Sequence, residues 1–167
     1  GIEFGDVSDS FDCSNNRLTS LKGSPVIVHG TFSCSNNKLT SLKYISQKIG
    51  GGLYCEHNEL RSMEYGPKEI NGSLDCSYNK LVSLKGCPDI IGWNLNCSNN
   101  QLVSLNGCPK LIANSLFCDP LPMIGFPIDL LDKVYFHIGD NETIGLKDCL
   151  GEKVDSLDIG IYLKKMI

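Results

Sequence analysis

Long hydrophobic runs are missing from this sequence of 167 residues. No apolar stretch approaches the roughly 20 residues of a membrane-spanning helix or the core of a signal peptide. An excess of positive charge is missing too, because 15 Lys and Arg residues stand against 19 Asp and Glu residues. A general nucleic-acid binder needs a strongly basic face. These absences predict one soluble, cytoplasmic domain without membrane association, and they argue against nucleic acid as its partner.

Paired metal-ligand cysteines are also absent. The chain has 9 cysteines, but it contains no C-x-x-C pair and no Cys/His cluster at ligand spacing. The odd number argues against a complete disulfide framework. We therefore expect no cofactor and no metal, with a metal site as the alternative, and the cysteines need another explanation.

Six of the cysteines recur at a fixed interval of 21 residues. They are Cys13, Cys34, Cys55, Cys76, Cys97 and Cys118. A large apolar residue lies two before each of them, and up to Cys97 a Leu lies five after. A fixed period of this kind is typical of a solenoid, whose stacked units together bury apolar faces that one unit cannot bury alone. Cysteines on stacked strands point side by side into one core, so we interpret them as small, reduced, buried hydrophobes.

Each unit has two apolar legs. The first leg, apolar-x-Cys, alternates with a period of two and predicts a very short strand. The return leg carries a proline in most units, for example Pro67 and Pro88. Because proline cannot donate to a ladder, the return leg is predicted to be a turn or an extended segment outside any sheet.

The unit beginning at Leu95 reads L-N-C-S-N-N-Q-L-V-S-L, with Cys108-Pro109 behind it. It resembles the leucine-rich repeat, whose units read L-x-L-x-x-N-x-L, over residues 11 to about 118. The short unit is most similar to the bacterial subclass found in secreted effectors, and its C-S-N-N form is similar to bacterial and bacteriophage proteins. The resemblance implies an α/β-type repeat solenoid with a parallel β-sheet on its concave face and a mostly irregular convex side. It also implies protein binding, in the cytoplasm of a bacterial or infected host cell.

Three segments are predicted. Residues 1–10 are expected to be part of a preceding repeat or added residues, because Val7 falls 21 residues before Val28. Residues 11–118 form the solenoid, and residues 119–167 form a mixed C-terminal cap. Within the cap, helical spacing from Pro127 to Tyr135 predicts a helix and residues 139–141 a turn. Residues 157–163 alternate as in a strand, with a helix as the alternative for the final residues.

Two polar columns are predicted to be structural. The asparagines three residues after each cysteine should bond backbone groups where the strand turns away. This asparagine ladder comprises Asn16, Asn37, Asn58, Asn79 and Asn100. A serine column, from Ser20 to Ser104 at the same interval, should bond the nearby backbone.

Function is expected at the positions that differ between repeats, which flank each core cysteine. By strand alternation, the residues directly before and after the cysteine should project from the outer, concave face. A third variable column lies two residues after the cysteine. Small Ser and Asn residues predominate in these columns in the first units, whereas aromatic and acidic residues follow. The candidate partner-binding residues are Tyr54, Glu56, His57, Asp75, Tyr78, Asn96 and Phe117. Aromatic anchors among polar neighbours are typical of binding hot spots. The alternative is an ordinary solvated sheet face.

Basic rows such as Arg17-Lys38-Lys80 and Lys22-Lys43-Lys85 are interpreted as a solvated edge, with phosphate contact as the alternative. We expect a non-enzymatic module that binds a protein with a basic surface, such as a host factor. One alternative is the targeting arm of a larger enzyme or effector whose catalytic domain lies outside this chain. Structural packing in an assembly is another. A thiol enzyme using His137 and Cys149 has no supporting motif.

Overall fold

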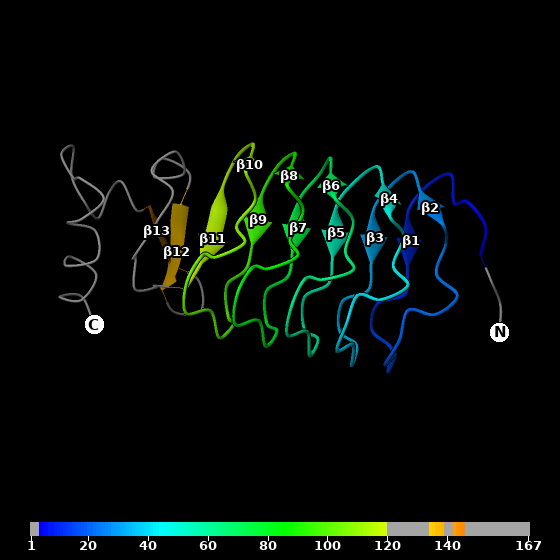
Figure 1. The fold of residues 1–167 in the computed structure, drawn as a ribbon, viewed down its shortest axis with the longest axis horizontal. Helices are drawn as coiled ribbons and strands as arrows, with labels where there is room; N and C mark the ends of the chain where they lie inside the picture. Colours follow the sequence, from blue (N-terminus) through cyan, green and yellow to red (C-terminus); the bar gives the residue numbers. More distant parts are fainter. Residues whose placement is uncertain (1–3, 120–133, 139–141, 146–167) are drawn as a thin grey trace.

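The computed structural model describes residues 4–119, 134–138 and 142–145. The chain winds into a stack of similar coils, which progress along the long axis of the molecule (Figure 1). Each coil contributes one strand to a continuous parallel sheet. Its first six strands are β1 (Phe11–Asp12), β3 (Phe32–Ser33), β5 (Leu53–Tyr54), β7 (Leu74–Asp75), β9 (Leu95–Asn96) and β11 (Leu116–Cys118). We number the coils 1 to 6 by these strands.

The register of this first sheet follows the sequence interval. Phe11 pairs with Phe32, Phe32 with Leu53, and Leu53 with Leu74. Val7 likewise forms a parallel bridge with Val28, as its position in the repeat predicts. Equivalent residues of successive coils therefore stack in columns, each about 4.8 Å from the next.

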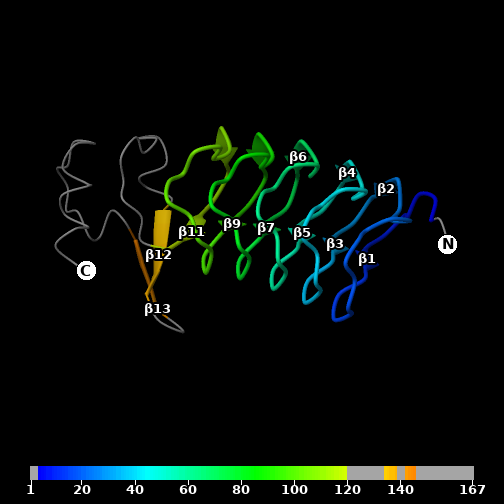
Figure 2. The same cartoon turned by 60° about the horizontal axis from the view of Figure 1, so that its bottom comes forward.

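The return leg carries strands of its own, so the prediction that it lies outside any sheet is wrong. These strands are β2 (Ile27–Val28), β4 (Lys48–Ile49), β6 (Glu69–Ile70), β8 (Ile90–Ile91) and β10 (Leu111–Ile112). They form a parallel pair, β2-β4, and a parallel three-stranded sheet, β6-β8-β10. Figure 2 shows this second row along a different side of the stack from the first sheet. The prolines do not prevent pairing, because Pro25, Pro67, Pro88 and Pro109 each lie two residues before a strand.

The fold is a parallel β-solenoid, which confirms the repeat-solenoid prediction in its general form. The described residues contain no helix, so the structure does not support the α/β assignment. The return leg from Leu21 to Val28 is shorter than an average helix of about 11 residues, and it includes Pro25. A helix long and apolar enough to span a membrane is likewise absent from the described part of the chain.

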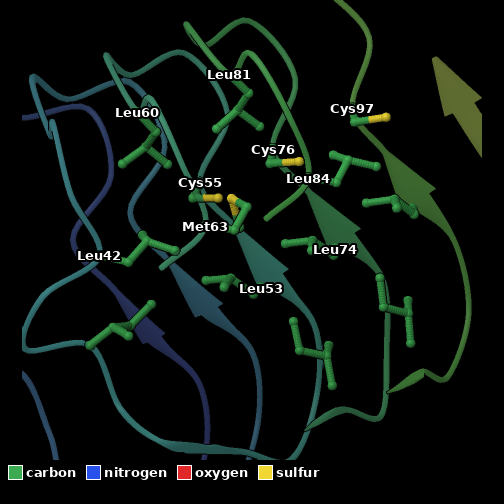
Figure 3. Close-up of a cluster of buried hydrophobic side chains, with 14 of the residues drawn as sticks. Leu42, Leu53, Cys55, Leu60, Met63, Leu74, Cys76, Leu81, Leu84 and Cys97 are labelled. Atoms are coloured by element: carbon green, nitrogen blue, oxygen red, sulfur yellow. The ribbon is translucent and has the colours of Figure 1, made fainter. Parts of the chain in front are cut away.

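The core lies between the two rows of strands and is filled by columns of identical or similar side chains. Figure 3 shows Leu53 and Leu74 from the first sheet in one cluster with the cysteine column, Cys55 and Cys76, and the leucine column, Leu60 and Leu81. Cys34, Cys55, Cys76 and Cys97 are completely buried. The Cys55 thiol donates to the Asp75 carbonyl of the next coil over 3.3 Å. All eight described cysteines carry free thiols. Five of the six cysteines at the 21-residue interval, from Cys34 to Cys118, are buried in the core as predicted, and Cys13 in the first coil is partly buried.

The asparagine ladder is structural, as predicted. The Asn58 amide nitrogen lies 3.2 Å from the carbonyl oxygen of Cys55 and 3.0 Å from that of Cys34 in the preceding coil. Its amide oxygen accepts the Leu39 N–H at 2.9 Å. Asn37, Asn79 and Asn100 repeat this pattern. Each side chain thus satisfies the backbone of two coils at the corner where the ladder ends.

The first sheet continues beyond residue 118. Strand β12 (Val134–Ile138) pairs in parallel with β11, and β13 (Glu142–Gly145) pairs antiparallel with β12. The helix predicted to include Val134 and Tyr135 is therefore wrong at these positions. The sequence V-Y-F-H-I has high strand propensity, and the open edge of β11 provides backbone N–H and C=O groups with which it can pair. The other elements expected in the cap, at residues 120–133, 139–141 and 157–163, lie outside the described residues.

Candidate functional site

The residues directly before the core cysteines form one column on the outer face of the first sheet, which is the face that points away from the core. Tyr54 is exposed, whereas Asp75, Asn96 and Phe117 are half-buried. This exposure agrees with strand alternation, because Leu53 and Cys55 on either side of Tyr54 are completely buried. Four of the predicted residues therefore lie in one column on coils 3 to 6.

The column after the cysteines is more buried than a free surface. Ser35, Ser77 and Ser98 are all buried. The Ser77 hydroxyl donates to Asp75 Oδ1 over 2.6 Å, and the Ser98 hydroxyl donates to Asn96 Oδ1 over 2.8 Å. These serines orient the polar side chains of the neighbouring column instead of presenting their own hydroxyls to a partner.

Glu56 occupies the same column as these serines. Its Oε2 atom is buried and has no hydrogen-bond partner among the described residues. Burial raises the pKa of Glu56 above its ordinary value of 4.5, and the nearby Asp75 charge raises it further. Coils 1, 2, 4 and 5 have Ser at this position, so the carboxylate of coil 3 is a costly exception.

The third column lies in the left-handed backbone region, which the sequence analysis did not predict. Its φ angles are 55° at Asn15, 53° at Asn36, 53° at His57, 50° at Tyr78 and 55° at Asn99. Asparagine tolerates this region, whereas a bulky tyrosine rarely adopts it. The His57 and Tyr78 rings stack with centroids 4.2 Å apart and an interplanar angle of 10°. Two predicted residues from adjacent coils thus form one aromatic surface.

A hollow of about 380 Å³ lies on the outer face between Tyr54 and Phe117. Its lining also includes Leu74, Asp75 and Asn96. The Asn96 amide donates to Asp75 Oδ2 over 3.1 Å, which links coils 4 and 5 across the hollow. Tyr54, Asp75, Asn96 and Phe117 are therefore brought together, with aromatic side chains at either end and polar groups between them.

Charge is segregated on the solenoid. The three columns around the core cysteines carry Asp12, Glu56, Asp75 and Asp119 but no Lys or Arg. The expected basic rows lie in the turns that follow, where Lys80 pairs with Glu59 at 2.8 Å and Lys85 with Glu64 at 3.2 Å. The outer face of the first sheet is thus acidic and aromatic.

A second left-handed column was also missed. Gly23, Gly86 and Gly107 have positive φ angles, but Tyr44 and Tyr65 hold the equivalent places in coils 2 and 3 at 75° and 70°. Both tyrosines are exposed, and Lys43 Nζ lies 5.1 Å from the centre of the Tyr44 ring. The 21-residue interval contains this signal, because three glycines at that spacing indicate a required conformation.

Thiol chemistry finds no support in the described part of the chain. Burial raises the pKa of Cys13 to about 11 and that of Cys108 to about 12, which opposes formation of the reactive thiolate. Cys149, which the thiol hypothesis needs, lies outside the described residues. The predicted interaction surface is the feature with a defined geometry.

Comparison with protein-family models, with curated proteins and with solved structures found no match for this chain.

Proposed function

We propose that this chain is a non-enzymatic binding module that recognises a protein with a basic surface through the outer face of its first sheet. The observation that carries the proposal is the stacked His57–Tyr78 pair beside the Tyr54–Phe117 hollow. Exposed aromatic side chains with fixed polar neighbours are the usual composition of a protein-binding hot spot.

Backbone strain supports this proposal. Coils 1, 2 and 5 have Asn where coils 3 and 4 have His57 and Tyr78, although all five residues share the same positive φ. Tyr78 is 46% exposed, so burial in the core does not offset the strained conformation. A binding role gives these exposed rings a function beyond the contact that they make with each other.

The repeat itself supports a more specific proposal, that the solenoid is of the leucine-rich-repeat type. Its frame places leucines, the core cysteine and the ladder asparagine at the positions that the resemblance implies. We extend this to a bacterial or bacteriophage protein that acts on a host factor in the cytoplasm.

The test is affinity capture of the partner, followed by measurement of Kd with both purified proteins. Tyr54→Ser and Tyr78→Asn introduce the residues that other coils carry at the equivalent positions, Ser33 and Asn99. We expect each to weaken binding by about 30-fold, the effect of losing one hot-spot residue worth about 2 kcal/mol.

Trp93→Asn is the matched control. Trp93 is also exposed, lies between β8 and β9 outside the lining of the hollow, and has Asn114 as its equivalent in the next coil. This variant should bind normally. The proposal is wrong if Trp93→Asn weakens binding while the two tyrosine variants leave it unchanged.

A further inference from the structure

We infer that the hollow between Tyr54 and Phe117 receives an arginine side chain of the partner, with Asp75 as the carboxylate that pairs with it. This inference rests on the proposed function and adds the chemistry of one contact within the same face.

The width of the hollow follows from the repeat. Tyr54 and Phe117 are three strands apart in one column, which corresponds to about 14 Å along the sheet. The two positions between them carry the smaller Asp75 and Asn96. A side chain that enters here meets aromatic walls at both ends and a polar floor.

The charge of the floor favours a cation. Asp75 accepts hydrogen bonds from the Ser77 N–H at 3.0 Å, the Ser77 hydroxyl at 2.6 Å and the Asn96 amide at 3.1 Å. These donors hold the carboxylate in place without neutralising it. The ion pairs of the described residues involve Glu59, Glu64 and Asp89, but not Asp75.

Other occupants fit less well. An anion would be repelled by Asp75 and Glu56, and an apolar side chain would remove water from Asp75 without replacing its interactions. Three of the roughly four acceptor sites of Asp75 are occupied, so its Oδ2 atom can accept one further N–H. Among cations, a guanidinium group is planar, can donate that N–H and at the same time stacks on aromatic faces. The hollow offers both kinds of contact, so arginine fits it better than lysine.

The probe is the blocked peptide acetyl-(Gly-Arg)₄-amide, compared with the same peptide containing citrulline, which keeps the shape of arginine without its charge. Binding to the full chain is measured by calorimetry and by shifts of the Tyr54 and Asp75 signals in NMR spectra. We expect the arginine peptide to bind and the citrulline peptide to bind at least tenfold more weakly.

Two charge-matched variants locate the contact. Asp75→Asn should weaken binding of the arginine peptide by about tenfold, whereas Asp12→Asn should change it by less than about twofold. Both remove one negative charge from the same column, but Asp12 lies outside the hollow. Asn96 Oδ1 accepts from Ser98 as Asp75 Oδ1 accepts from Ser77, so Asp75→Asn should keep the bonds to Ser77 and lose only the bond from the Asn96 amide. Circular dichroism should show that the variant folds.

Equal binding of the citrulline peptide would overturn the inference, because charge would then be irrelevant. Equal weakening by Asp12→Asn and Asp75→Asn would also overturn it, because only the general field of the face would matter. Either failure leaves the proposed function intact if Tyr54→Ser and Tyr78→Asn still weaken capture of the protein partner.

Discussion

The interior of the solenoid and its outer face follow opposite rules. Inside, coils 1 to 5 repeat the core cysteine, the ladder asparagine and the leucine five residues after the cysteine. Asn37, Asn58 and Asn79 make the same contacts with two coils each. Outside, coils 1 and 2 carry small side chains, whereas coils 3 and 4 carry a stacked aromatic pair and half-buried acids. The stacking of the coils therefore constrains which residues occupy the interior, whereas the residues of the outer columns can differ between coils.

The largest effect on stability is expected from the interior. Asn79→Ala removes the acceptor of the Leu60 N–H and the donor to the Cys55 and Cys76 carbonyls, all of which remain buried. We expect the free energy of unfolding in urea to fall by about 3 kcal/mol.

Asn16→Ala is its control at the end of the ladder. Asn16 is exposed and bonds only carbonyls of its own coil, those of Cys13 and Ser14. A loss of less than about 1 kcal/mol is expected, because water can replace these bonds. Similar losses for both variants would remove the distinction between interior and surface.

A smaller loss is expected where the turn of each coil meets its neighbour. Gly107 has a φ of +84°, and a Cβ atom there would lie 2.6 Å from the Lys85 nitrogen. Gly107→Ala should therefore lower the free energy of unfolding by about 2 kcal/mol. Gly5→Ala is the control, because a Cβ atom at Gly5 would meet nothing within 4 Å beyond its chain neighbours. An unchanged unfolding midpoint for Gly107→Ala would refute the tight contact.

On the outer face, a substitution should weaken partner binding without a large change in the free energy of unfolding. Tyr78→Asn loses the stacking on His57 but places Asn at a φ of 50°, which it tolerates well. We expect the unfolding free energy to change by less than about 1 kcal/mol, since the two contributions oppose each other. Denaturation and partner binding are measured on the same preparation. A large loss of stability would mean that Tyr78 is part of the packing.

The smallest effect is expected from the pH dependence of Glu56. Its raised pKa means that the folded chain binds the proton more tightly than the unfolded chain. The stability due to this group is present below pH 4.5 and is lost as the pH rises through the raised value. Glu56→Ser should thus stabilise the protein at pH 7 but not at pH 4, as measured by the urea midpoint. A gain that is equal at both pH values would contradict this cause.

The sequence predicts most of what repeats. A fixed interval of 21 residues identifies the strand register, the buried cysteines and the asparagine ladder, because each is a column of identical residues. The strands of the return leg escape prediction because proline argues against a hydrogen-bonded strand, although Pro67 stands two residues before β6 and leaves its backbone free to pair. Strand β12 was missed because V-Y-F-H-I gains its partner only when β11 is in place.

The candidate site was predicted only as a set of variable positions. The pairing of His57 with Tyr78, and the hollow between Tyr54 and Phe117, depend on side-chain directions that a single repeat does not contain. The left-handed columns were missed for a related reason. Asn and Gly indicate this conformation locally, but His57, Tyr78, Tyr44 and Tyr65 reveal it only by comparison with other coils.

The central claim is that the coils share one dry interior, so that recognition is confined to the outer columns. Alkylation of the native chain with iodoacetamide at pH 8, followed by peptide mass spectrometry, tests it most directly. The account predicts that Cys34, Cys55, Cys76 and Cys97 stay unmodified until the chain unfolds and then react together. Alkylation of these four thiols in the native state, or their oxidation in pairs, would contradict it.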